Sequence, residues 1–156
     1  MNPTYRSARR VPALAICLSA LASSAALAQE AATAGWPGWR GPMRNGISLE
    51  TGWTWMWPEA GPQVLWEAEV GHGFSSFAVA GGRIFTMGNS DDQDSVYCFD
   101  AATGEVLWKH TYACPREPLS YEGGPSSTPL VDGGRVYTLS KFGHCHCLSA
   151  QTGDVL

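Results

Sequence analysis

Charged residues are scarce in this sequence, and basic residues are scarcer than acidic ones. Of the 156 residues, 15% are charged and 44% are hydrophobic, a balance that excludes a disordered tail. The formal net charge is −4, and three of the 10 basic residues, Arg6, Arg9 and Arg10, precede the first acidic residue, Glu30. The chain after them therefore carries 7 basic and 14 acidic residues. Because this leaves no basic stripe, we do not expect nucleic acid or an anionic membrane surface as a partner.

Long hydrophobic runs are also missing, except for one short run near the N-terminus. Residues 11–21 are mostly apolar, follow the three arginines and precede the small residues that end at Ala28. A charged region, an apolar region and an Ala-x-Ala site in this order are typical of a secretory signal peptide. We predict a signal peptide over residues 1–28 and a periplasmic or extracellular mature chain with no transmembrane span. An uncleaved anchor helix is the alternative.

The sequence lacks the motifs of several enzyme classes. It has no Gly-x-Ser-x-Gly nucleophile motif, no Cys-x-x-Cys-His haem motif and no evident carboxylate pair for glycoside hydrolysis. His72 lies near Ser75, but closeness in sequence does not make a base and nucleophile pair. The acidic run at Asp91, Asp92 and Asp94 lacks EF-hand spacing, so we interpret it as a solvated loop. No catalytic residue and no metal ligand is predicted.

An internal repeat organises the chain after the predicted signal peptide. Residues 78–86 align with residues 130–138 at an offset of 52, with Gly-Gly-Arg and a Thr in common. Residues 98–107 align with residues 147–156 at an offset of 49. The two offsets differ by three residues, and the difference falls between the aligned segments. We therefore predict that the first copy has the longer loop, over residues 89–94, as expected for a structural repeat.

Each copy of the repeat predicts four short strands. In the first copy the strands are predicted at residues 76–80, 83–87, 96–101 and 105–111, because Val, Ile, Phe, Tyr and Thr alternate with Gly-rich turns. No useful length of the mature chain has a helical period. The predicted fold class is all-β, and four strands repeating every ~40–50 residues are typical of a β-propeller.

The domain organisation follows from the repeat. Residues 29–62 form a segment rich in Trp, Gly and Pro, and residues 63–156 form a partial propeller. Residues 76–111 are one complete blade and residues 126–156 most of a second. A closed ring needs more blades, so we interpret the sequence as the N-terminal piece of a longer protein.

The turn between the third and fourth strands resembles a known repeat signature. Asp100, Thr103, Gly104 and Trp108 resemble the signature of the PQQ-like (quinoprotein alcohol dehydrogenase-like) β-propellers, in which an Asp and a Thr-Gly turn precede a strand with a Trp. The second copy keeps Thr152 and Gly153 and has Ser149 in place of the Asp, and Trp66 marks a third copy of the last strand. The resemblance implies that the segment at residues 64–70 is a strand that completes the last blade of a ring.

The N-terminal segment resembles part of the same family. Residues 36–42 and 44–48 are similar to the opening of exported, planctomycete-type PQQ-like repeat proteins. We expect Trp66 and Trp108 to close neighbouring blades by packing on the Gly-containing turns. For Trp36, Trp39, Trp53, Trp55 and Trp57 two interpretations stay open, a flap on the ring and an aromatic binding platform.

The cysteines and the remaining histidines do not predict a metal site. On a strand, Cys145 and Cys147 share one face and His146 points away, so the three cannot converge on one ion. Cys98 and Cys147 occupy equivalent positions of the repeat, which favours buried core residues. His110 is expected at an outward or rim position. Disulfides are permitted in an exported protein, but the pairing of Cys98, Cys114, Cys145 and Cys147 stays open.

Two functions follow from the resemblance. The first is an exported, non-enzymatic scaffold that binds a protein or another envelope macromolecule, similar to the propeller subunit of the outer-membrane β-barrel assembly machinery. The second is a PQQ- and Ca²⁺-dependent alcohol or sugar dehydrogenase. The second needs a Glu, an Asn, an Asp and a Trp at the ring axis, and none of these roles can be placed on this sequence. No cofactor is therefore assigned, and the scaffold is preferred.

Overall fold

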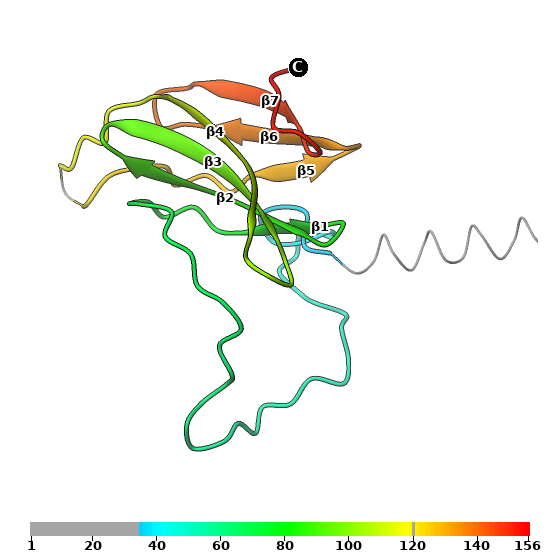
Figure 1. The fold of residues 1–156 in the computed structure, drawn as a ribbon. Coiled ribbons are helices and arrows are strands. Elements are labelled where there is room, and N and C mark those ends of the chain that lie inside the picture. Colours follow the sequence, from blue (N-terminus) through cyan, green and yellow to red (C-terminus); the bar gives the residue numbers. More distant parts are fainter. Residues whose placement is uncertain (1–34, 120) are drawn as a thin grey trace, which may run out of the picture. The chain divides into compact units, whose positions relative to one another are not determined.

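Seven strands in two antiparallel sheets make up the regular structure of the part of the chain that the structure describes (Figure 1). The structure, a computed structural model, describes residues 35–119 and 121–156. No helix occurs in these two stretches, so neither holds a helix that is long and apolar enough to cross a membrane. The predicted all-β class is confirmed, whereas the predicted signal peptide lies outside the described residues.

The first sheet is a four-stranded meander. Its strands are β1 (Ala78–Ala80), β2 (Arg83–Ser90), β3 (Gln93–Asp100) and β4 (Val106–Ala113), and they lie in that order. All four strands occur where the alternation of β-branched and aromatic residues predicts them. β2 and β4 end later than expected, and β3 begins earlier.

The prediction of a loop over residues 89–94 is wrong. Asn89 pairs with Asp94 and Ser90 pairs with Gln93, so the extra residues of the first copy lengthen a hairpin. Only Asp91 and Asp92 form the turn, with φ angles of 53° and 56°. Two consecutive residues in the left-handed conformation form a type I′ turn, whose twist matches that of the two hairpin strands. Asp tolerates this conformation better than most residues. Polar residues that resemble a loop in the sequence therefore continue the sheet.

The second sheet repeats the first in a shorter form. It contains β5 (Leu130–Asp132), β6 (Arg135–Leu139) and β7 (Cys145–Ser149) in sequential order. A bridge between Leu148 and Val155 places the last residues beside β7, as the fourth strand lies beside β3 in the first sheet. The 49-residue repeat of the sequence is therefore also a repeat of strand order.

The segment at residues 64–70 is unpaired in this structure, and its role as the strand that completes the last blade of a ring stays a prediction. Within the described residues no backbone ladder includes it. Its neighbour His72 forms an isolated bridge with Asn89 at the far end of β2. The segment is attached to the first sheet through the side chain of Trp66, whose contacts are described below.

The backbone of Trp36 and Pro37 connects the two sheets. Trp36 exchanges two hydrogen bonds of 2.8 Å with Val79 of β1, and the carbonyl oxygen of Pro37 accepts one of 2.7 Å from Val131 of β5. These two strands make the main strand-to-strand contact between the sheets. Both sheets also contribute to one core cluster, formed by Ala78, Phe85, Met87, Val96, Cys98, Trp108, Val136 and Leu148.

Candidate functional site

Trp108 on β4 connects the first sheet to the last turn of the second. Its indole Nε1–H donates a hydrogen bond of 3.1 Å to the carbonyl oxygen of Ala150. The ring covers Gly153, where an added Cβ would lie 2.7 Å from ring atoms. Gly153 also has a φ of 78°, so the turn needs a glycine both for its backbone conformation and for the approach of the ring.

Trp66 makes the same contact with the first sheet. Its Nε1–H donates to the carbonyl oxygen of Ala101 at 3.1 Å, and an added Cβ on Gly104 would lie 2.5 Å from its ring. The ring also stacks on Phe99, with centroids 6.0 Å apart. Because Ala101 and Ala150 are equivalent in the repeat, both tryptophans make one repeated contact between a ring and a Thr-Gly turn.

Asp100 closes the turn in the first sheet. Its Oδ1 accepts hydrogen bonds from the backbone N–H of Ala102 at 3.0 Å and from both the N–H and the hydroxyl of Thr103. These bonds, the one from the Thr103 backbone above all, lower the pKa of the Asp100 carboxyl. In the second sheet the Ser149 hydroxyl accepts from the N–H of Thr152 at 3.2 Å, so Ser replaces Asp with fewer bonds.

Arg83 is a residue that the sequence analysis did not single out. Its guanidinium donates hydrogen bonds to the carbonyl oxygens of Ala150 at 2.7 Å and Gln151 at 3.0 Å. Two side chains of the first sheet, Arg83 and Trp108, therefore hold one turn of the second. The only signal in the sequence was that this arginine aligns with Arg135 in both copies of the Gly-Gly-Arg motif.

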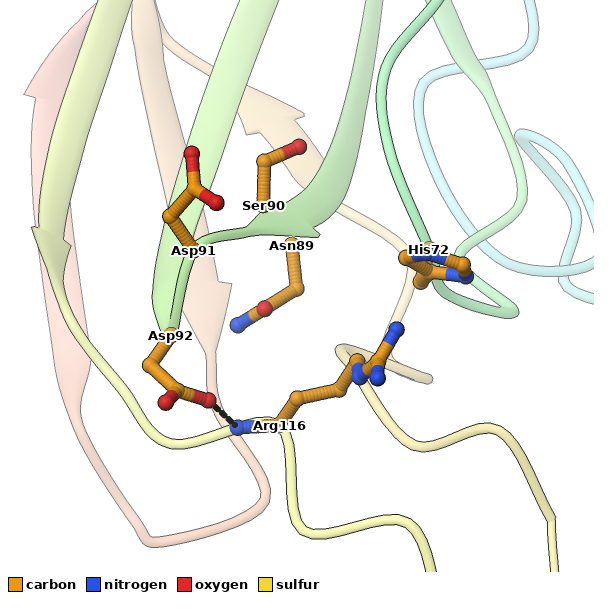
Figure 2. Close-up of a pocket in the computed structure, with 6 residues that line it drawn as sticks. All are labelled: His72, Asn89, Ser90, Asp91, Asp92 and Arg116. Atoms are coloured by element: carbon orange, nitrogen blue, oxygen red, sulfur yellow. Dashed lines mark hydrogen bonds between the residues drawn. The ribbon is translucent and has the colours of Figure 1, made fainter.

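A polar pocket of about 480 Å³ lies at the tip of the β2–β3 hairpin (Figure 2). Arg116 reaches it from the loop after β4, and its backbone N–H donates to Asp92 Oδ1 at 2.9 Å. His72 lies on the other flank and faces Glu122 at 3.7 Å. The pocket is built on the lengthened hairpin, a feature of the first sheet alone. It is lined by His72, Asn89, Ser90, Asp91, Asp92 and Arg116.

A buried polar network lies behind this pocket. The side chain of Asn89 donates to Asp94 Oδ1 at 2.7 Å and to the carbonyl oxygen of Cys114 at 2.9 Å. The Tyr112 hydroxyl donates to the other carboxylate oxygen of Asp94 at 3.3 Å. Burial and the neighbouring Asp94 carboxylate raise the pKa of Tyr112, so the phenol stays protonated and remains a donor.

Three of the histidines gather around Tyr112, where β4 faces β7. The ring centroids of Tyr112 and His146 are 4.3 Å apart, and those of His110 and His146 are 5.3 Å apart. His144 meets the edge of Tyr112 at 5.7 Å. His110, expected at an outward or rim position, is half-buried and lies beside His146 of the other sheet. Burial, together with the charges of His110 and His144, lowers the pKa of His146.

The four described cysteines are free thiols in different surroundings. Cys98 and Cys114 are buried, and burial raises the pKa of each to about 11. Cys147 is half-buried, although it is equivalent to Cys98, because only the short stretch of residues 153–156 lies along the outer side of β7, where β3 has the whole of β4. Across residues 35–119 and 121–156, no group of three or more His, Cys, Asp or Glu residues could hold a metal ion.

The tryptophans of the N-terminal segment divide into two groups. Trp36 is attached to the sheets, and residues 36–46 fold back so that its ring packs against Gly41. Trp53, Trp55 and Trp57 are exposed by 73%, 79% and 64% and lie in an irregular stretch. Trp39 is also exposed, by 70%. Both interpretations of the segment, a flap on the ring and an aromatic platform, stay predictions.

A family model matches most of the described chain. The model of a family described as outer membrane protein assembly factor BamB matches residues 57–156, which include both sheets, both Thr-Gly turns and Trp66. The chain belongs to this family. The predicted PQQ-like repeat is confirmed, and the two sheets are the blades of a partial β-propeller. A search of curated proteins found no match.

In this BamB-family chain, the residues that carry the family signature lie between blades. Thr103 and Gly104 form the turn that Trp66 covers, and Thr152 and Gly153 form the turn that Trp108 covers. None of these residues lines the pocket at the hairpin tip. The repeat therefore supplies the scaffold, and the pocket comes from residues that only the first blade has.

Proposed function

We propose that this protein is an exported, non-enzymatic β-propeller repeat protein that acts as a scaffold for another protein of the cell envelope. The observation that carries the proposal is the family match over residues 57–156, because the family is described as an assembly factor of the outer membrane. Export rests on the signal-peptide pattern of residues 1–28.

The use of side chains in the two blades supports a scaffold. The side chains of Trp66, Trp108 and Arg83 bond to the turns of the two blades, so they hold the repeat together. The hairpin tip and the loop after β4 contain no signature residue, so they can differ from one blade to the next. Function in propellers is placed on such loops, which a rigid ring holds in position.

The cofactors of the rival function do not fit the residues at the blade junction. PQQ and Ca²⁺ at the ring axis would need a Glu, an Asn and an Asp. The strands that meet at the junction of the two blades, β1 and β5, carry Ala, Val and Leu with one carboxylate, that of Asp132. The backbone of Trp36 and Pro37 is hydrogen-bonded across both strands. This set offers no ring of oxygen ligands for Ca²⁺.

Export and scaffold function are tested separately on the full-length protein. N-terminal sequencing of protein from the periplasmic or extracellular fraction is expected to start at Gln29, and a cytoplasmic protein that keeps residues 1–28 would contradict export.

For the scaffold, a photo-crosslinking residue is introduced at Asp91 on the hairpin tip or at Glu105 in the turn after β3. We expect a discrete adduct with one envelope protein from at least one of these sites.

A cofactor titration separates the scaffold from the dehydrogenase. The purified protein is incubated with PQQ and Ca²⁺, and dye reduction is measured with primary alcohols and aldose sugars. The proposal expects no PQQ-dependent dye reduction and no PQQ that co-elutes with the protein. Ca²⁺-dependent retention of PQQ with alcohol oxidation would overturn it.

A further inference from the structure

A second cavity, of about 270 Å³, lies between the loop of residues 37–44 and strand β5 of the second blade. The loop is drawn in cyan beside β1 in Figure 1. The volume is just below the roughly 300–1,000 Å³ of most small-molecule sites, which suits one small ring rather than a longer chain. Its lining includes Pro37, Trp39, Pro42, Arg44, Leu130 and Asp132.

The loop that forms one wall of this cavity is fixed to the sheet. The carbonyl oxygen of Pro37 accepts a hydrogen bond of 2.7 Å from β5, and an added Cβ on Gly38 would lie 2.9 Å from the side chain of Leu130. Further along the loop, Gly41 lies against the ring of Trp36. The cavity is therefore formed before a ligand arrives, and binding does not have to order the loop.

Trp39 lines the cavity with an indole that the described chain leaves uncovered. It is 70% exposed, whereas Trp108, which covers a Thr-Gly turn, is 8% exposed. Within residues 35–119 and 121–156 the indole N–H of Trp39 makes no hydrogen bond, while those of Trp66 and Trp108 both bond to a turn. An uncovered aromatic ring at a cavity offers a platform for an apolar face of a ligand.

Arg44 and Asp132 bring one positive and one negative charge to the same cavity. In the two described stretches, neither side chain takes part in a hydrogen bond or an ion pair. Arg40 of the same loop differs, since its guanidinium donates to the carbonyl oxygen of Asn45 at 3.3 Å. Because the two charges of the cavity cancel, it favours a neutral ligand that can donate to a carboxylate and accept from a guanidinium.

The backbone of Arg44 is held in a conformation that arginine does not favour. Its φ of 53° is left-handed, which is unfavourable for a residue with a Cβ. Its N–H donates to the carbonyl oxygen of Gly41 at 3.1 Å, and the N–H of Gly46 donates to that of Arg40 at 2.9 Å. Such conformations persist where the surroundings impose them, and they gather at ligand sites.

The repeat does not require the carboxylate of Asp132. At the 52-residue offset its equivalent in the first blade is Ala80, and both residues precede a Gly-Gly-Arg turn. The pairing is also equivalent, with Ala80 opposite Arg83 and Asp132 opposite Arg135. The hairpin therefore forms with or without an acidic residue at this position, and Asp132 is an addition of the second blade.

We propose that this cavity binds one neutral hexopyranose unit. The apolar C–H face of the sugar ring stacks on the indole of Trp39, one hydroxyl donates to the carboxylate of Asp132, and a neighbouring hydroxyl accepts from the guanidinium of Arg44. The site goes beyond the scaffold function and does not depend on it, since none of these three side chains takes part in the contacts between the blades.

The test measures binding of neutral sugars to the full-length protein in the absence of PQQ. The probes are the methyl glycosides of glucose, galactose, mannose and N-acetylglucosamine. Protein labelled with ¹⁵N-tryptophan is observed by NMR, and Trp39→Phe assigns the indole signal of Trp39 by its loss. Trp53, which is 73% exposed and lies outside the cavity, is the internal control. N-acetyl-tetraproline amide is the comparison probe, because proline-rich peptides also dock on exposed aromatic rings.

At least one of the sugars is expected to shift the Trp39 signal and leave the Trp53 signal unchanged. Asp132→Ala and Arg44→Gln are each expected to weaken that sugar about tenfold, because each removes one charge-assisted hydrogen bond. Arg40→Gln is the matched control for Arg44→Gln. Arg40 belongs to the same loop, has a left-handed φ of 65° and does not line the cavity, so its replacement is expected to leave the affinity unchanged.

Deoxy analogues of the binding sugar separate a direct contact from a structural effect. One of them is expected to bind the unmodified protein about tenfold more weakly, because it lacks the hydroxyl that donates to Asp132. In Asp132→Ala this analogue and the parent sugar are expected to bind alike, because the partner of the hydroxyl is gone. If the substitution weakens every analogue and its parent by the same factor, the contact with Asp132 does not exist and the proposal is wrong.

Three results with the unmodified protein would also overturn the proposal. The first is that none of the four sugars shifts the Trp39 signal. The second is that the sugars shift the Trp39 and Trp53 signals alike, since any exposed indole would then suffice. The third is that the tetraproline probe shifts the Trp39 signal and the sugars do not, because the cavity would then take a peptide.

Discussion

The indole N–H of Trp108 donates to the carbonyl oxygen of Ala150, 42 residues further along the chain, at 3.1 Å. Trp66 makes the equivalent bond to Ala101 at the same distance. Each tryptophan ends one repeat and covers the Thr-Gly turn of the next. Neighbouring blades are therefore joined in series, and the stability of each blade depends on contacts with its neighbours, as in other repeat proteins.

Replacing Trp108 with Phe should destabilise the junction between the two blades. The ring is 8% exposed and lies 5.9 Å from Phe85 in the core, and Phe cannot donate the bond to Ala150. The free energy of unfolding is expected to fall by about 1–3 kcal/mol from the lost volume and the unpaired carbonyl. Urea unfolding followed by circular dichroism measures the change.

Trp53→Phe is the matched control for that substitution. Trp53 is 73% exposed, so its replacement is expected to change the free energy of unfolding by less than about 0.5 kcal/mol. Equal losses in the two variants would show that the contact of Trp108 with the turn does not stabilise the protein.

Gly153→Ala should be more harmful than the same change at another left-handed glycine. Gly153 and Gly52 have φ angles of 78° and 82°, so an alanine is strained by about 1–2 kcal/mol at either position. At Gly153 the new Cβ would also lie 2.7 Å from the Trp108 ring, whereas at Gly52 it meets no atom within 4 Å. We expect Gly153→Ala to lose at least about 1 kcal/mol more.

Thermal or urea unfolding of the two glycine variants checks this expectation. The difference between them isolates the contact with the ring, because the backbone strain is common to both. A loss at Gly52 as large as that at Gly153 would mean that the close approach of Trp108 relaxes without cost.

The sequence was sufficient to predict the strands and the repeat, because both depend on local patterns. Alternating apolar residues and Gly-containing turns fix β1 to β4 to within a few residues, apart from the longer ends of the β2–β3 hairpin. The hairpin tip was misjudged because Asn89 and Asp94 are polar and yet buried. Their burial depends on Tyr112 and Cys114, which approach only in the folded chain.

The same limit explains the other differences between sequence and structure. The partial burial of His110 does not follow from the sequence, because a single strand does not reveal what covers it, and β7 of the next blade supplies that cover. The segment at residues 64–70 has a strand-like composition, but composition provides no hydrogen-bonding partner. The pocket combines residues that are up to 44 positions apart, from His72 to Arg116, so no local sequence motif predicts it.

Stability should fall as the pH is lowered through the range in which histidine titrates. The pKa of His146 is below its ordinary value of 6.5, chiefly because of burial. The unfolded state therefore binds more protons than the folded state just below about pH 6.5, and the free energy of unfolding decreases as the pH falls. Tyr112, His110 and His144 face the imidazole, and none of them supplies a negative charge at neutral pH.

His146→Gln tests that dependence, because glutamine does not titrate. The free energy of unfolding is measured for each protein at about pH 7.5 and about pH 5.5, so that any constant packing loss cancels. The variant is expected to show the smaller decrease between the two values. An identical decrease in both proteins would assign the pH dependence to other groups.

The cysteines should differ in their reaction with an alkylating reagent. Cys98 and Cys114 are 0% and 1% exposed, and with a pKa of about 11 each is about 0.1% thiolate at pH 8. Cys145 is exposed on β7. In the reduced native protein, iodoacetamide is therefore expected to modify Cys145 first and the two buried thiols only after unfolding. Peptide mass spectrometry at successive times assigns each site, and Cys145→Ser is expected to remove the fast reaction. Modification of Cys98 as rapid as that of Cys145 would show that the sheet around Cys98 opens readily, because the thiolate is the reacting species and burial suppresses it.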